Sequence, residues 1–236
     1  MAGTGSVASL HRYPVKSMTG ETLEVLDLDD RGVVGDRSWA VRTESGRIGS
    51  GKRTRRFEAV EGLLRLRARL GEAGPVVMLP DGESFDVTAA GAGDALSRHL
   101  GAAVTLAPED EVDHFDDGPV SLLGLASVDA LAAELGAEVD PGRFRANIVV
   151  EGWPAYAEDA RVGRTLRLGG QVDGVLLEVT MRSPRCVMVD MESADLPLQP
   201  GVLRAAGRAN EACLGVIARV VRPGRVRLGD RVETQT

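Results

Sequence analysis

The sequence is short of cysteine, of positive charge and of long apolar runs, and each shortage excludes a class of protein. Cys186 and Cys213 are the only cysteines, which is too few, at too wide a spacing, for a disulfide framework or a CxxC zinc site. They are therefore either core residues or residues that take part in chemistry. The three histidines show no HxH or HExxH spacing, so we do not expect a metal site built from histidine.

Positive charge is in deficit, because Lys and Arg total 28, Asp and Glu total 35, and the formal net charge is -7. Nucleic-acid-binding proteins neutralise phosphates with an excess of Lys and Arg. We therefore expect no nucleic-acid partner, and any phosphate site must be local. No apolar run approaches the ~18 residues of a membrane span, and no charged leader precedes an apolar stretch at the N-terminus. We expect a cytoplasmic protein without membrane association.

The chain has 236 residues, 43% of them apolar, which is enough for one large or two modest domains. In residues 63–70, apolar residues alternate with arginines, which is the period of a half-buried strand. Turns at residues 71–75 and 81–82 then predict a meander of antiparallel strands. Residues 38 to about 105 are accordingly predicted to form a small β unit.

Helices are predicted to be few. The clearest has an N-cap at Ser127, apolar residues on one face and a stop at Gly136. The segments that follow are short, β-branched and interrupted by Gly and Pro, which is typical of barrels and sandwiches. The sequence thus predicts a mainly β fold with a few short helices.

A glycine-rich segment, GRIGSGKR at residues 46–53, has the Gly and Lys spacing of a phosphate-binding P-loop. Arg53, however, stands where that motif needs a Ser or Thr hydroxyl for magnesium. The flanking sequence is also typical of strand-turn-strand, so a glycine-rich hairpin is the better interpretation. The basic continuation at residues 52–56 is interpreted as a solvated face, with Arg55 or Arg56 as an alternative contact to an anionic ligand.

Two short segments near the N-terminus carry donors that suit an anion. In YPVKS at residues 13–17, Lys16 and Ser17 follow a proline where the chain leaves a strand; the alternative is a surface lysine in a turn. In GDR at residues 35–37, the planar guanidinium of Arg37 suits bidentate contact with a phosphate. The alternative for Arg37 is an ion pair with a carboxylate such as Asp36.

The segment FRAN at residues 144–147 carries a third polar pair. Arg145 and Asn147 are two residues apart, which on a strand would put both on one face. They then form either a cross-strand polar ladder or half of a polar pocket.

The segment RSPRCVMVD at residues 182–190 is the most informative. Cys186 follows Arg182 and Arg185, and a basic setting favours the reactive thiolate of a cysteine. The alternative is a buried cysteine that behaves as a small apolar residue. Cys213 has no such basic neighbours and is interpreted as a core residue.

Taken together, five ordered segments resemble the MOSC (molybdenum cofactor sulfurase C-terminal) family. The segments are YPVKS (13–17), GDRSW (35–39), GRFRANIVV (142–150), PRCVMVD (184–190) and ARVVRPGRVRLGD (218–230). Their order is that of MOSC proteins with an N-terminal β-barrel subdomain, and the chain is similar to the bacterial relatives of the mitochondrial amidoxime reducing component. The likeness covers nearly the whole chain.

The resemblance implies a MOSC-type β-barrel core with a smaller packed β subdomain. It implies an N-terminal segment, residues 1–37, that contributes to a cofactor pocket, a β subdomain at residues 38–105 and the MOSC domain at residues 106–236. It also implies that Cys186 is the protein ligand to molybdenum. The residues that would line the pyranopterin and its phosphate are Lys16, Ser17, Arg37, Arg145, Asn147 and Arg185. The chain departs from its relatives at Gly118, where some relatives have a serine, and at Pro184, where a side-chain hydroxyl is lost.

The function that the resemblance implies is a molybdenum-dependent oxidoreductase. It would reduce N-hydroxylated small molecules of the amidoxime or hydroxylamine type, with electrons from an external ferredoxin-, flavin- or cytochrome-type reductase. Asp190 is a candidate general acid only because it is close in sequence to Cys186; its alternative is a turn residue at a strand end. A thiolate would equally serve a sulfur carrier or cofactor-handling module with a Cys186 persulfide, and a third alternative is a binding domain with an incidental thiol. Older family descriptions also imply pyridoxal phosphate, for which no lysine has a convincing Schiff-base setting.

Overall fold

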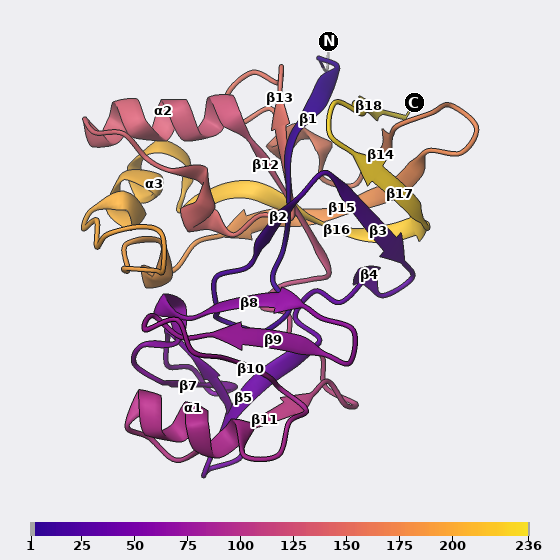
Figure 1. Cartoon of the computed structure of the whole chain (residues 1–236). Helices are drawn as coiled ribbons and strands as arrows, with labels where there is room; N and C mark the ends of the chain where they lie inside the picture. The colour runs from indigo at the N-terminus through magenta and orange to yellow at the C-terminus, as the bar shows by residue number, and fades with distance from the viewer. Residues whose placement is uncertain (1–2, 236) are drawn as a thin grey trace.

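The chain folds into two parts that Figure 1 shows one above the other. The computed structural model describes residues 3–235, and within them strands far outnumber the three α-helices. The predicted fold class, mainly β with a few short helices, is confirmed. The upper part holds a barrel and two helices, and the smaller lower part holds short sheets and one helix.

Seven strands of an eight-stranded sheet close into the barrel of the upper part. Around the barrel they are β13 (Ile148–Glu151), β12 (Val120–Gly124), β16 (Cys213–Arg222), β15 (Val175–Pro184), β14 (Thr165–Leu168), β18 (Arg231–Thr234) and β1 (Gly5–Arg12). β1 pairs with β18 on one side and with β13 on the other, which closes the ring. β2 (Glu21–Leu23) extends the sheet beside β1.

The barrel interior is a packed apolar core. Along β14 and the first half of β15 every second residue is buried, and Leu166, Leu168, Val175, Leu177 and Val179 are fully inside. This alternation is what a strand with one face toward a core requires. A small sheet of β3 (Val25–Asp29), β4 (Gly32–Val33) and β17 (Gly224–Arg227) packs against the same core through Leu26, Leu28 and Val226.

The smaller part is built from two sheets and a helix. One sheet contains β5 (Trp39–Thr43), β6 (Ile48–Ser50), β7 (Phe57–Ala59) and β11 (Val104–Pro108). The predicted meander is confirmed as β8 (Arg67–Leu70), β9 (Pro75–Met78) and β10 (Ser84–Asp86). Helix α1 (Ala92–Leu100) leads into β11. The glycine-rich segment is a β5–β6 hairpin, as interpreted from the sequence.

The alternating run at residues 63–70 is only partly a strand. Leu64, Leu66 and Ala68 are buried as the alternation predicts, but residues 63–65 form a single turn of 3-10 helix. The turn begins at Gly62, whose φ of 88° lies in the left-handed region that glycine adopts at low cost. A two-residue period therefore identified the buried face without identifying the backbone conformation.

Helices α2 (Leu125–Leu135) and α3 (Val202–Asn210) pack together on the barrel. α2 ends before Gly136 as predicted, but it begins at Leu125, so the predicted N-cap at Ser127 is wrong. The Ser127 hydroxyl instead donates to Glu158 Oε2 at 2.8 Å and accepts the Tyr156 N–H. The sequence pattern predicted that this hydroxyl caps the helix, but it bonds instead to residues distant in sequence.

The N-terminal segment passes through both parts. β1 is a barrel strand, whereas Val15 and Met18 lie in the apolar core of the smaller part. Residues 109–119 lead back from β11 to the barrel strand β12. The two crossings place residues 13–18 and 109–119 at the junction, where the candidate site lies. No helix within residues 3–235 is long and apolar enough to cross a membrane.

Candidate functional site

Cys186 lies just beyond the end of β15. Pro184 is the last residue of that strand and lacks an N–H for further pairing. The chain then turns into a short 3-10 helix, Val187–Val189, and Cys186 immediately precedes it. The Cys186 side chain is half-buried and lines a cavity that is partly open to solvent.

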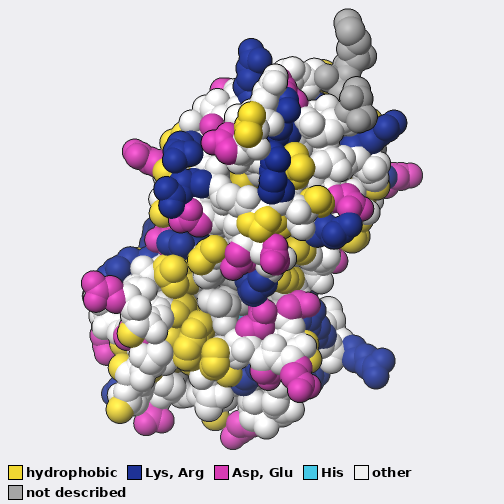
Figure 2. Space-filling model, turned by 90° about the vertical axis from the view of Figure 1, so that its right-hand side faces the viewer, with side chains coloured by type: hydrophobic (Ala, Val, Ile, Leu, Met, Phe, Trp, Pro, Cys, Tyr) yellow, Lys and Arg dark blue, Asp and Glu magenta, His cyan; other side chains and the backbone are white. Residues whose placement is uncertain are grey.

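This cavity, called the first cavity below, is lined by more positive than negative side chains. The cations are Arg37, Lys52, Arg143, Arg145 and Arg185, and the carboxylates are Asp116 and Asp117. On the face shown in Figure 2, by contrast, basic and acidic side chains are interspersed without a large area of one sign. In a chain of net charge -7, the cavity is thus a local place for an anion.

Asp116 joins three segments at the first cavity. Its carboxylate accepts from Lys16 Nζ and from Lys52 Nζ, each at 2.7 Å. These two residues are the only lysines of the chain. Burial lowers the pKa of Lys16 to about 8, although Asp116 opposes that shift. Burial alone would raise the pKa of Asp116, but the two lysines outweigh it and hold that pKa well below its usual range.

Arg37 is held by its neighbour in sequence. Its guanidinium pairs with the Asp36 carboxylate, which is fully buried, and donates to the Arg145 carbonyl oxygen at 3.2 Å. Burial alone would lower the pKa of Arg37, but Asp36 outweighs burial and raises it. The alternative interpretation of Arg37, an ion pair with Asp36, is therefore present together with its place on the cavity wall.

Arg145 has no such partner. Its guanidinium makes no hydrogen bond and no ion pair with any residue between 3 and 235, and burial lowers its pKa to about 10. The residue ends the 3-10 helix Pro141–Phe144 with a φ of 51°, in the left-handed region that non-glycine residues seldom adopt. β13 begins only at Ile148. The prediction that Arg145 and Asn147 share a strand face is therefore wrong.

Arg185 is bound almost entirely to main-chain carbonyls. It donates to Leu214 O at 2.8 Å through Nε and to Phe144 O at 3.0 Å through Nη1. Burial lowers the pKa of Arg185 to about 10. Gly215 of β16 leaves room for the Arg185 guanidinium, because a Cβ there would lie 3.3 Å from Arg185 Nη2 and 2.4 Å from the Leu122 carbonyl oxygen. The φ of Gly215 is 80°.

Ser17 and Asn147 use their polar groups inside the protein. The Ser17 hydroxyl is buried and donates to Ser50 Oγ at 3.2 Å. The Asn147 carboxamide oxygen accepts from the Ser121 N–H and hydroxyl, and its nitrogen donates to His11 O at 3.3 Å. Neither residue lines the first cavity, and Lys16 reaches it only through Asp116.

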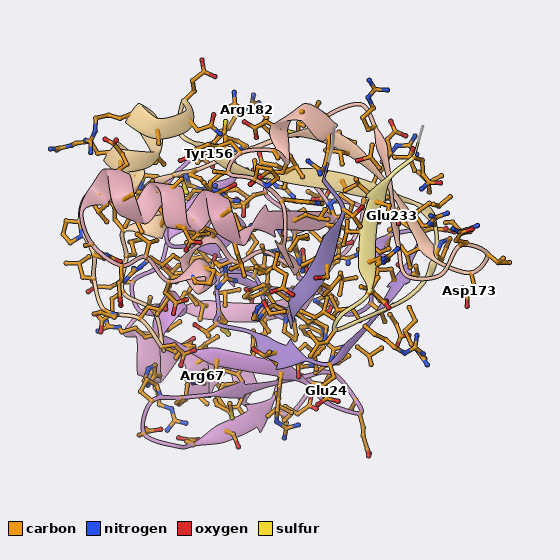
Figure 3. All side chains as sticks on the ribbon, turned by 90° about the horizontal axis from the view of Figure 1, so that it is seen from above. Glu24, Arg67, Tyr156, Asp173, Arg182 and Glu233 are labelled. Carbon is orange, nitrogen blue, oxygen red and sulfur yellow. The ribbon has the colours of Figure 1, made fainter. Side chains whose placement is uncertain are left out.

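A second cavity adjoins the first and shares Arg143, Arg145 and Met188 with it. The second cavity is also partly open to solvent and is lined further by Tyr13 and, from one segment, by Met191, Ser193, Asp195 and Leu196. That segment is tied to the smaller part by Asp195, which pairs with Arg67 of β8, labelled in Figure 3. The two cavities therefore adjoin at a wall that includes Arg145.

Sequence reasoning missed Lys52, Asp117 and Arg143 as lining residues. Lys52 stood in the run interpreted as a solvated face, and the alternative contacts in that run do not reach the cavity. Arg56 donates to Phe115 O and Asp113, and Arg55 is exposed. Asp113, Asp116 and Asp117 form part of an acidic run that could have indicated partners for the basic one.

Comparison with known proteins gives the family. The family model described as "MOSC domain" matches residues 97–233, more than half of the chain, and the model described as "MOSC N-terminal beta barrel domain" matches residues 4–115. The chain belongs to the MOSC domain family. The predicted resemblance is confirmed. MOSC domains are associated with proteins that bind the molybdenum cofactor.

One of three similar solved structures, that of YuaD, supports the fold of this MOSC protein. The YuaD protein of Bacillus subtilis is 18% identical with a TM-score of 0.55, and the match covers 98% of this chain and 95% of that one. YiiM from Geobacillus stearothermophilus is 15% identical with a TM-score of 0.40, over 50% of this chain and 54% of that one. YiiM from Escherichia coli is 12% identical with a TM-score of 0.44, over 100% of this chain and 70% of that one. No curated protein matches.

Two local features of this MOSC protein bear on what the site can hold. Gly118 lines the first cavity, and a Cβ there would lie 2.5 Å from Ile217 Cγ2, so a serine has no room. Asp190 lines neither cavity; its Oδ1 accepts the Leu203 N–H at 2.8 Å at the start of α3. Asp190 is thus a turn residue, but it follows the 3-10 helix Val187–Val189 and not a strand end, which was the alternative given for it. In the part of the chain that the structure describes, no three His, Cys, Asp or Glu side chains gather to hold a metal ion.

Proposed function

We propose that this MOSC protein binds a molybdenum cofactor across the two joined cavities, with Cys186 as the protein ligand to the metal. The observation that carries this proposal is the Arg145 guanidinium, which lines both cavities and has no hydrogen-bond or ion-pair partner among the described residues. Arg145 is half-buried, and a cation that loses part of its hydration without an anionic partner is destabilised. An anionic ligand at this position would remove that cost, and the phosphate of a pyranopterin is such a ligand.

The remaining residues fit the same ligand. The Cys186 thiol is half-buried at the first cavity, and a soft thiolate suits molybdenum already held by an organic dithiolene. Arg37 and Lys52 line the wall of the first cavity, each paired with a carboxylate, and Arg143 borders both cavities. The remaining predicted contacts act in part through others: Ser17 and Asn147 fix neighbouring segments, and Lys16 orients Asp116.

The activity we propose is the reduction of an N-hydroxylated small molecule. The bound cofactor supplies the two-electron redox chemistry. In the balanced reaction, two electrons and two protons enter, the N–O bond breaks, an N–H bond forms and water leaves. With only two cysteines, the chain cannot build a four-cysteine iron–sulfur cluster, so the electrons come from an external reductase.

Asp117 is the group that we propose holds a proton for this reaction. Its carboxyl lines the first cavity with Cys186 and has no hydrogen-bond or ion-pair partner within residues 3–235. Partial burial raises the pKa of Asp117, and the charge of Asp116 adds to the shift. Adjacent carboxyls with opposite pKa shifts divide into one that stays charged and one that can carry a proton. Asp116 would hold the lysines while Asp117 exchanges protons with solvent.

Pyridoxal phosphate gains no support from the site. A Schiff base needs a lysine amine that can react with the cofactor. Both lysines of the chain are bound to Asp116, and Lys16 is buried.

The test compares Cys186→Ser with Cys213→Ser in protein purified from a host supplied with molybdate. We expect the wild type and Cys213→Ser to contain equimolar molybdenum and to reduce benzamidoxime with dithionite-reduced viologen. Cys186→Ser should lose both properties while its circular dichroism spectrum is unchanged. Full turnover by Cys186→Ser would refute the assignment. Transfer of labelled sulfur to Cys186 from a cysteine desulfurase, without turnover by the metal-loaded wild type, would favour the sulfur carrier.

A further inference from the structure

Tyr13 lies beneath two guanidinium groups at the centre of the site. Its side chain is 6% exposed and borders the second cavity. The Arg145 Cζ lies 4.4 Å from the centroid of the Tyr13 ring, and the Arg37 Cζ lies 4.9 Å from it. Like charges held this closely repel each other, so the arrangement needs a source of attraction. The electron-rich face of an aromatic ring attracts a cation within about 6 Å.

The two guanidiniums differ in what else holds them. Arg37 is neutralised by Asp36, and Asp36 Oδ1 also accepts the Tyr13 N–H at 2.7 Å. The main-chain N–H of Arg37 also donates to the Tyr13 carbonyl oxygen at 2.7 Å, and this bond fixes the tyrosine backbone. The Arg145 side chain makes no hydrogen bond or ion pair within residues 3–235, so its direct contact is the Tyr13 ring, while Asp36 and Asp116 attract its charge without pairing with it.

From this geometry we infer that Tyr13 is a positioning residue, whose ring holds Arg145 as a free cation ready to receive the phosphate end of the bound cofactor. The inference rests on the proposed function and adds a residue that none of the sequence motifs assigned to the site. Arg145 adopts a φ of 51°, and a strained backbone at a binding residue is a common feature of preorganised sites. The planar fork of arginine then presents paired donors to a phosphomonoester.

The hydroxyl of Tyr13 is separable from its ring. It makes no hydrogen bond in the described part of the chain, and burial raises the pKa of Tyr13, so the hydroxyl remains protonated near neutral pH. If the ring positions Arg145, a phenylalanine retains the function and an aliphatic residue loses it. If the hydroxyl is a direct ligand, phenylalanine and leucine lose the function alike.

The test measures the affinity of the full chain for inorganic phosphate, using protein from a host that cannot make the cofactor. We expect Tyr13→Leu to weaken phosphate binding about tenfold, the effect of a partly desolvated cation–π contact. Tyr13→Phe should stay within about twofold of the wild type, because the ring is kept. Arg145→Met should abolish saturable binding. The same variants from a cofactor-making host should rank in the same order in the pterin they release on denaturation.

A matched control is Tyr156→Leu. Tyr156, labelled in Figure 3, is a half-buried tyrosine that packs with α2 and α3. Equal loss of phosphate affinity in Tyr156→Leu and Tyr13→Leu would attribute the effect to general destabilisation and overturn the inference. Unchanged phosphate affinity in Tyr13→Leu, equal losses in Tyr13→Phe and Tyr13→Leu, or absence of saturable binding by the wild type would also overturn it. If the expected phosphate pattern holds but the wild type binds no molybdenum, the proposed function fails and the role of Tyr13 stands.

Discussion

The two sides of the first cavity hold their positive charges by different means. On the side of the smaller part, Lys16 and Lys52 share the Asp116 carboxylate, so much of their charge is cancelled. On the barrel side, Arg143 and Arg185 donate to main-chain carbonyls, which carry no net charge. The first arrangement ties segments together, whereas the second leaves full positive charge beside the cavity. Attraction of an anion is therefore expected to come mainly from the barrel side.

The largest effect is expected when the barrel side is broken with Arg185→Met. The change leaves the carbonyls of Leu214 and Phe144 buried without their donors. Each unsatisfied group costs about 1–3 kcal/mol, so the free energy of unfolding should fall by about 3 kcal/mol. Urea denaturation measures this. Arg219→Met, which removes an exposed pair with Glu178, should change it by less than about 1 kcal/mol; an equal loss in both variants would contradict the comparison.

A sharper test of this comparison is Asp117→Asn. It removes the carboxyl that lines the cavity without a hydrogen-bond or ion-pair partner on either side, within residues 3–235. Loss of a proton-transferring group should lower kcat about 100-fold without loss of molybdenum. Because the pKa of Asp117 is raised, wild-type activity that needs the protonated form should fall as the pH rises through that pKa. The variant should lack this step in its pH–rate profile. A variant with wild-type kcat and the same profile would exclude Asp117 as the proton donor.

On the side of the smaller part, where the lysines share one carboxylate, the pairing is removed by Asp116→Asn. This variant leaves Lys16 as a buried charge without its partner. Breaking a buried pair costs several kcal/mol, but the Asp116 side chain is 37% exposed, so we expect about 2 kcal/mol. The pKa of Lys16 in the fold is about 8, below its value of 10.5 when unfolded. The destabilisation should therefore shrink above about pH 8, where folded Lys16 is neutral in both proteins.

Denaturation of Asp116→Asn at pH 7 and at pH 9.5 tests this expectation. Asp113→Asn removes an exposed carboxylate that pairs with Arg56 and is the matched control. A loss that is independent of pH would show that Lys16 is not the group responsible.

The smallest effect is expected at His114, which is fully buried on the side of the smaller part. Its Nδ1 contacts the Arg37 carbonyl oxygen at 3.1 Å, and its Nε2 lies 3.4 Å from Arg42 Nη2. Burial lowers the pKa of His114 below 6.5, and the Arg42 charge adds to the shift. As the pH falls, His114 is therefore protonated in the unfolded chain before it is protonated in the fold. The contribution of His114 to the free energy of unfolding is full above pH 6.5 and decreases below it.

His114→Gln should reduce that acid loss and lower stability at pH 7.5 by about 1 kcal/mol, the value of a hydrogen bond. His99→Gln, at an exposed position, should do neither. His11 also has a lowered pKa, so some acid dependence should remain in the variant. An unchanged pH profile in His114→Gln would contradict the assignment to His114.

The sequence predicted those features that depend on local periodicity. The meander, the mainly β fold and the end of α2 follow from alternating burial and from glycine at turns. The five ordered segments predicted the family, and they brought Cys186, Arg37, Arg145 and Arg185 to one cavity. These residues lie on three separate segments, and no spacing in the sequence gives the proximity of those segments.

The remaining features depend on tertiary partners. Ser127 could be a cap or a tertiary donor, and only the position of Glu158 decides between them. Lys52 belonged to a basic run that looked solvated until the fold brought Asp116 beside it. The left-handed conformation of Arg145 ends a 3-10 turn that no motif indicates. Each of these features depends on which residues distant in sequence the fold brings into contact. Local propensities carry no information about such contacts.

The scarcity of lysine gives the site a built-in chemical reporter. An endoprotease that cleaves only after lysine meets two susceptible bonds in the whole chain, after Lys16 and after Lys52. Both side chains are bound to the same carboxylate, and the Lys16 N–H is bonded to the Trp39 carbonyl oxygen at 2.8 Å. Cleavage therefore requires this junction to open, and its rate reports how often it does. The intensity of three fragments on a gel would thus follow the opening of this junction, with no background from the rest of the molecule.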